Sequence, residues 1–60
     1  MYRVEIVMGS LDEIRKVEKA LELPLWEGIT VNSKEYADSV ACAAYDVCPW
    51  IDVDVREVAA

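Results

Sequence analysis

The sequence predicts a small α+β fold in which two helices pack on one face of a small antiparallel sheet. Alternating apolar and polar residues near both ends of the chain indicate strands, whereas two internal segments carry apolar residues at helical spacing. The predicted order is strand, helix, connector, helix, strand, and the 60 residues are interpreted as one domain, residues 1–60. A domain of this size has a marginal core, so self-association is expected to stabilise it.

The first strand and helix are predicted in the first third of the chain. A strand over residues 2–8 directs four apolar side chains to one face: Tyr2, Val4, Ile6 and Met8. Gly9 ends this strand, and Ser10 with Glu13 has the spacing of a capping box that begins a helix. That helix is expected to end before Pro24. Its apolar stripe consists of Leu11, Ile14, Val17 and Leu21.

A connector over residues 23–31 leads to the second helix, and residues 29–31 within it are a candidate for a very short strand. Asn32 or Ser33 is expected to cap a helix that runs to about Val47. Helical periodicity predicts a buried side of mostly small residues, with Tyr36 and Ala43 at its border: Ala37, Val40, Ala41, Ala44 and Val47. The opposite, polar side is expected to face solvent: Glu35, Asp38, Ser39, Cys42 and Asp46.

Pro49 ends the second helix, and a final strand is predicted after it. Its residues alternate as in a sheet with one covered and one wet face, with Ile51, Val53 and Val55 against Asp52, Asp54 and Arg56. Val58 is a candidate to extend this strand. Up-and-down counting makes it antiparallel to the first strand if the two pair. Because a two-stranded sheet is barely stable alone, either residues 29–31 add a strand or two chains join edges, and we expect a homodimer.

The charge of the chain restricts its partners. Twelve Asp and Glu residues against six Lys and Arg residues give a formal net charge of −6. A polyanion repels such a protein, so direct binding to nucleic acid is not expected, and a basic protein surface is the favoured partner. No apolar run approaches the roughly 18 residues of a membrane span, and the first residues alternate charged and apolar groups, unlike a signal peptide. We therefore expect a cytoplasmic protein with no membrane partner.

Residues suited to catalysis or metal binding are scarce. The chain has no histidine, which is the commonest general base near neutral pH. Cys42 and Cys48 stand among acidic residues that suppress thiol reactivity. Reduced thiols are expected, and one disulfide between them stays open as the alternative. Two thiols fall short of the four ligands of a structural zinc. The sequence therefore predicts no catalytic residue, no cofactor and no metal.

Asp52 and Asp54 place two carboxylates about 7 Å apart on one strand face. A solvated face that discourages edge-to-edge aggregation is favoured over a divalent cation site. Arg56, and Arg3 across the sheet, are expected to neutralise these carboxylates in part.

Negative charge is concentrated in one part of the chain. Residues 1–19 contain four acids and four bases, whereas residues 20–55 contain seven acids and only Lys34. A strongly negative surface is therefore expected on the outer face of the second helix and the wet face of the last strand. Such carboxylates approximate the spacing of phosphates along a nucleic-acid strand. The alternative is that they only keep a small protein soluble.

Two tryptophans give a second indication of binding. Trp26 and Trp50 lie in irregular segments, and tryptophan is a frequent interface anchor. The alternative is that each ring covers one end of the small core. Trp26 is expected to be the more exposed. The predicted partner-binding residues are Trp26, Glu35, Asp38, Asp46, Trp50, Asp52 and Asp54.

Together these observations favour a small acidic domain that binds a basic protein, as an inhibitor or adaptor. The sharpest form of this hypothesis is a nucleic-acid mimic that occupies the groove of a nucleic-acid-binding protein. A structural protein whose main partner is itself is the alternative. A metal or redox role for the two cysteines comes third.

Overall fold

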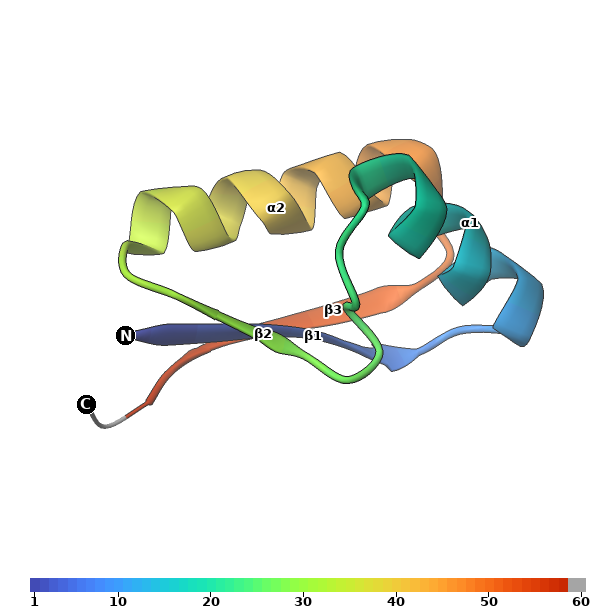
Figure 1. The fold of residues 1–60 in the computed structure, drawn as a ribbon. Helices are drawn as coiled ribbons and strands as arrows, with labels where there is room; N and C mark the ends of the chain where they lie inside the picture. Colours follow the sequence, from blue (N-terminus) through green and yellow to red (C-terminus); the bar gives the residue numbers. More distant parts are fainter. Residues whose placement is uncertain (59–60) are drawn as a thin grey trace.

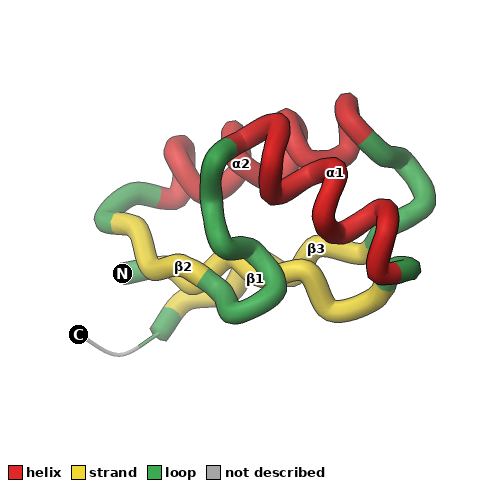
Figure 2. The backbone as a smooth tube through the Cα atoms, turned by 45° about the vertical axis from the view of Figure 1, so that its right-hand side comes forward, coloured by secondary structure: helices red, strands yellow, loops and turns green. Residues whose placement is uncertain are grey.

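The computed structural model describes residues 1–58 and contains three strands and two helices. The elements are β1 (Tyr2–Met8), α1 (Leu11–Leu21), β2 (Ile29–Val31), α2 (Lys34–Val47) and β3 (Asp52–Glu57). The strands form one antiparallel sheet in the order β2-β1-β3, and both helices lie on the same face of it (Figures 1 and 2). The predicted α+β fold is confirmed, with β2 as the third strand. Within residues 1–58, neither helix has the length and apolar character that a bilayer span requires.

Both helices begin at serine caps: Ser10 as predicted, and Ser33, which is one of the two candidates predicted for α2. The Ser10 hydroxyl accepts a hydrogen bond from the Glu13 amide (3.3 Å), and the Glu13 carboxylate accepts one from the Ser10 amide (3.1 Å). This reciprocal pair is the predicted capping box. At α2 the cap is Ser33, whose hydroxyl accepts from the Tyr36 amide (3.1 Å), and no carboxylate stands at position 36 to reciprocate. The α1 start therefore has one more satisfied amide than the α2 start.

The core lies between the sheet and the helices. It takes two residues from β1, two from α1, and a run of small residues from α2, together with residues from the connections: Val4, Ile6, Ile14, Val17, Leu25, Ala37, Val40, Ala44, Cys48 and Ile51. The small side chains of α2 allow its backbone to approach the sheet closely. Of the predicted buried side of α2, Ala41 and Val47 are only partly buried, because they lie at its margins.

A bulge overturns one predicted position in β1. Met8 was expected on the buried face with Val4 and Ile6, but it is 65% exposed. The register with β3 shifts between Ile6 and Met8, so that Val7 has no partner on β3. This additional residue breaks the alternation of side chains along β1. Ile51 packs nearby instead: a Cβ added to Gly9 would come within 2.8 Å of its Cγ2 atom.

Leu11 is also more exposed than its helical spacing predicts, at 62%. It is the first residue of α1. The core contacts of this helix come from Ile14 and Val17, with Leu21 partly buried beside them. Leu11 precedes these residues by a turn, so it continues their stripe beyond the covered part of the sheet.

The connector between α1 and β2 is anchored to β1. The Ile6 amide donates to the Leu25 carbonyl (2.8 Å), and Leu25 is fully buried. Arg3 donates from Nη2 to the Glu27 carbonyl (2.7 Å). Gly28 follows with a φ of 94°, a region that favours glycine, and a Cβ there would come within 2.5 Å of the Arg3 guanidinium. These contacts direct the chain into β2.

The two caps provide a test of local stability. We expect Ser10→Ala and Ser33→Ala each to destabilise the protein by about 1 kcal/mol, which lowers the thermal midpoint by roughly 4–8 °C in a domain of this size. Thermal unfolding followed by circular dichroism measures both. Ser39→Ala is the matched control, because Ser39 is exposed inside α2 and caps nothing. An equal loss in all three variants would contradict the capping assignment.

Candidate functional site

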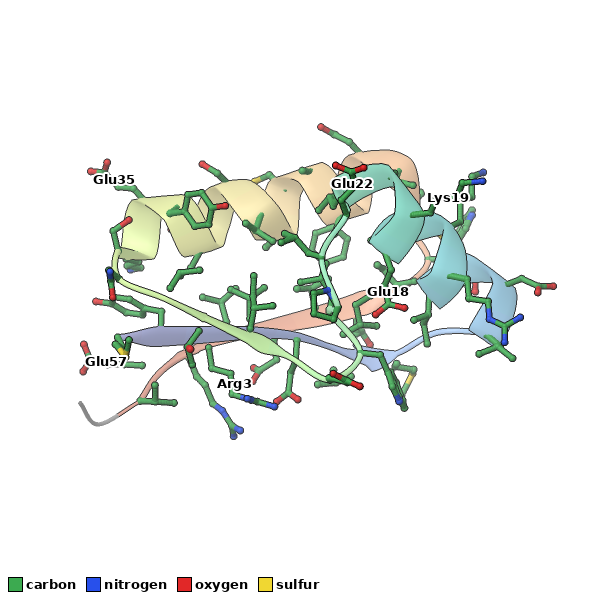
Figure 3. The ribbon with its side chains drawn as sticks, in the orientation of Figure 1. Arg3, Glu18, Lys19, Glu22, Glu35 and Glu57 are labelled. Carbon is green, nitrogen blue, oxygen red and sulfur yellow. The ribbon has the colours of Figure 1, made fainter. Side chains whose placement is uncertain are left out.

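The outer face of α2 carries the predicted acidic residues. Glu35, Asp38 and Asp46 are all exposed, as are Ser39 and Cys42 between them. Residues at positions 35, 38 and 46 fall on one helix face, and they span about 16 Å along the axis at a rise of about 1.5 Å per residue. Glu35 points away from the sheet in Figure 3. We call Glu35, Asp38 and Asp46 the acidic stripe.

No basic side chain within residues 1–58 forms a salt bridge with the acidic stripe. The salt bridges in this part of the chain join Arg3 and Arg56 to Glu5 and Asp54 on the far face of the sheet. The field of the acidic residues reaches the start of β1, where the pKa of the Tyr2 phenol is raised. The chief cause is the negative charge of Glu57, followed by burial, with a smaller contribution from Asp38.

Ion pairs neutralise part of the negative charge on the open face of the sheet. Arg56 lies 3.4 Å from Glu5 and 3.8 Å from Asp54, and Arg3 lies 3.5 Å from Glu5. The sequence predicted that Arg56 and Arg3 would partly neutralise this face; the structure shows this for Asp54. Asp52 is exposed and pairs with Met8 beyond the bulge.

The structure therefore divides the predicted site residues between two layers. The acidic stripe lies on the helical layer, and Asp52 and Asp54 lie on the strand at the other side of the core (Figure 1). The negative charge of residues 20–55 does not form one continuous surface. The three members of the acidic stripe have no ion pair among residues 1–58.

The order of exposure of the tryptophans was predicted wrongly. Trp50 is 82% exposed and Trp26 is 55% exposed. The Glu18 carboxylate accepts a hydrogen bond from the Trp26 amide (3.1 Å), which holds the connector against α1. Trp50 lies in the turn between α2 and β3, where the adjacent Ile51 occupies the core and leaves the ring in solvent.

A groove that the sequence did not reveal lies beside Trp26. Its volume is about 260 Å³, and it is lined by Leu11, Ile14, Arg15, Glu18 and Trp26. Glu18 reaches from α1 toward the connector (Figure 3). The groove depends on where the connector crosses α1, and no local pattern in the sequence specifies that crossing. The exposed Leu11 lines this groove.

The two cysteines are free and differ in environment. Cys42 is exposed on α2, and Cys48 is buried at its C-terminal end. The Cys48 thiol donates to Glu13 Oε2 (3.2 Å), a contact that bridges the end of α2 and the start of α1. Within residues 1–58, no three Cys, Asp or Glu side chains gather as a possible metal site.

Glu13 therefore joins two structural contacts. The pKa of its carboxyl group is lowered, chiefly because the carboxylate accepts from the Ser10 amide, with further contributions from the Ser10 hydroxyl and the Cys48 thiol. A carboxyl group whose pKa is lowered by folding adds stability above its unfolded pKa, and this stability is lost as the pH falls through the folded pKa.

Glu13→Gln tests this linkage. Glutamine keeps the capping geometry but has no charge to lose. We expect the thermal midpoint of the variant to fall below that of the wild type near pH 7, and the difference to shrink as the pH falls below about 4.3, the ordinary pKa of glutamate, and the native carboxylate becomes protonated. Thermal unfolding across this pH range measures the difference. A gap that is the same at every pH would contradict the role of the charge.

The chain was also compared with known proteins. No protein-family model matches it, and no curated protein and no solved structure shows significant similarity to it. Its function must therefore be inferred from its own residues.

Proposed function

We propose that this chain is a non-enzymatic protein-binding domain that presents the acidic stripe of α2 to a basic surface on another protein. The observation that carries the proposal is the exposure of three carboxylates on one helix face, without an ion pair among residues 1–58. Charges on a helix are held at fixed spacing, so little order is lost when a partner binds. Their field accelerates encounter with a cationic surface, and salt weakens it.

The free thiols support a reducing compartment for this function. Cys42 and Cys48 are both unpaired, and cytoplasmic conditions keep thiols in that state. The proposal therefore places the domain in the cytoplasm as an inhibitor or adaptor of a basic protein.

In its sharper form, the proposal is mimicry of one nucleic-acid strand. The three charges of the acidic stripe are separated by axial intervals of about 4.5 and 12 Å, a mean spacing of about 8 Å. Duplex DNA has one charge per about 1.7 Å of its axis and about 3.4 Å for each strand, so the acidic stripe resembles a single strand more than a duplex. The stripe alone supports this idea, because Asp52 and Asp54 lie on the other layer.

Trp50 supplies an apolar contact near the end of the acidic stripe. It follows Asp46 by four residues, just after α2 ends, and it is the most exposed large apolar side chain among residues 1–58. Leaving so large a ring in water forgoes the stability that burying it would give. Tryptophans of this kind are frequent anchors of protein interfaces.

Charge reversal of the acidic stripe tests the proposal. The triple variant E35K/D38K/D46K is immobilised beside the wild type and exposed to the lysate of its native host at about 50 mM and about 500 mM salt. We expect the wild type to capture a basic protein at low salt, the variant to lose it by at least about tenfold, and high salt to release it from the wild type.

The matched control is D12K/E22K/E27K, which reverses three exposed acids outside the acidic stripe. Each replacement of an acid by lysine changes the net charge by +2, so both triple variants have a formal net charge of zero instead of −6. The proposal requires the control to retain the partner. Equal loss in both triple variants would show that net charge alone governs capture. For the mimic, a single-stranded oligonucleotide must compete with the wild type for the captured protein.

Trp50→Ala separates the contribution of the ring from that of the charges. Because Trp50 is largely exposed, its removal should change the free energy of unfolding by no more than about 0.5 kcal/mol. We expect capture of the basic partner to weaken severalfold while the thermal midpoint stays close to that of the wild type. Unchanged capture would remove Trp50 from the proposed interface.

A further inference from the structure

The outer edge of β3 is long and open. Within residues 1–58, β3 pairs only with β1, and its second edge meets no strand. β3 has six residues, whereas the other edge strand, β2, has three. An exposed strand edge is a template for a further strand.

Two hydrogen bonds show which groups of β3 point outward. The Val58 amide donates to the Met1 carbonyl (2.9 Å), so the backbone N–H and C=O groups of even-numbered residues in this segment point toward β1. The Val53 amide donates to the Tyr45 hydroxyl (3.0 Å), so the backbone N–H and C=O groups of odd-numbered residues point toward the open edge. In an antiparallel ladder these directions alternate. The outward groups of β3 are therefore those of Val53, Val55 and Glu57, and the amide of Val53 already has a partner.

Charge selects one register for a second copy of β3. Pairing centred on Asp54 or Arg56 places each of these residues opposite its own copy, and like charges directly opposite are destabilising. Pairing centred on Val53 opposes Asp52 to Asp54, which is again a pair of like charges. Pairing centred on Val55 places each Asp54 opposite Arg56 of the second copy.

We propose that two copies of this chain associate through their β3 edges, antiparallel, with the two Val55 residues facing each other at the two-fold axis. The sheet then continues in the order β2-β1-β3-β3-β1-β2. The two Val55 residues exchange two hydrogen bonds, and each Glu57 amide donates to the Val53 carbonyl of the second copy. Val53 lies opposite Glu57 in this register, so the Glu57 carbonyl of the second copy takes the place of the Tyr45 hydroxyl at the Val53 amide.

The arrangement of charge within one chain favours this pairing. Residues directly opposite each other on neighbouring strands form a row across the open face. Arg3 lies opposite Arg56, and Glu5 lies opposite Asp54, so each row within one chain has two like charges. In the dimer the Arg3–Arg56 row continues into Asp54 and Glu5 of the second copy. Each row then has two positive and two negative charges, with unlike charges meeting at the new strand pair.

Charged residues on an edge strand often prevent association, but they do so best when they repel every incoming strand. Here Asp54 and Arg56 flank Val55 with opposite signs, so two copies are complementary in one antiparallel register. The Val55 side chains lie on the helix side and are partly buried. They add an apolar contact between the copies at the axis.

Charge exchange between positions 54 and 56 tests the register. Sedimentation velocity over a concentration series is expected to show a wild-type dimer. Asp54→Arg and Arg56→Asp should each raise the dissociation constant of the dimer by about tenfold or more, since each creates two like-charge pairs at the axis. The double variant D54R/R56D restores unlike pairs and should recover the wild-type dissociation constant.

Each single reversal keeps the fold testable, because the new charge faces an unlike charge on β1. The arginine introduced at position 54 would face Glu5, and the aspartate introduced at position 56 would face Arg3. Circular dichroism checks that both variants fold. Glu22→Arg is the control for charge alone, and it should leave the dimer unchanged, because Glu22 is exposed at the end of α1, outside both β3 and the acidic stripe.

Val55→Pro removes an outward amide without removing a bond to β1, and it should abolish the dimer. A monomeric wild type, a dimer indifferent to the single reversals, or a double variant without recovery would overturn the proposal.

Discussion

The central strand β1 determines where the rest of the chain lies, because among the described strands it alone is paired on both edges. Its odd-numbered residues bond toward β3, and its even-numbered residues bond toward β2 and the connector, as the bond from Ile6 to Leu25 shows. Val4 and Ile6 point from this strand into the core beneath the helices. One strand thus sets both the connector path and the direction in which β3 presents its free groups.

The sequence predicted the fold well because its signals are local. The capping box at Ser10, the Ser33 cap and Pro49 act within a few residues, and they bound both helices nearly where the structure has them. The predictions for Met8 and Leu11 were wrong because their exposure depends on contacts between segments that are distant in the sequence. A bulge in β1 turns Met8 outward, and the position of α1 over the sheet leaves Leu11 uncovered. The groove at Trp26 was missed for the same reason, since it forms only when the connector crosses α1.

The same distinction holds for charge. The sequence shows that residues 20–55 carry the excess negative charge, and helical periodicity correctly placed Glu35, Asp38 and Asp46 on one exposed face. Asp54 lies near Arg56 because both are on one face of β3, whereas Glu5 lies near Arg56 only because β3 pairs with β1 in one alignment. Carboxylates near a cation project a weaker field than isolated ones. The uncompensated surface is therefore smaller than the composition implies.

The symmetry of the proposed β3 dimer determines where its two acidic stripes lie. A two-fold axis that joins two β3 edges into one sheet keeps both helical layers on the same side, so the dimer presents two acidic stripes to the same partner. Their mutual repulsion opposes dimer formation, and a cationic partner that contacts both removes it. Because such coupling is reciprocal, a partner that binds the dimer more tightly than the monomer also strengthens the dimer by the same factor. Association through β3 and recognition through α2 are then two parts of one equilibrium.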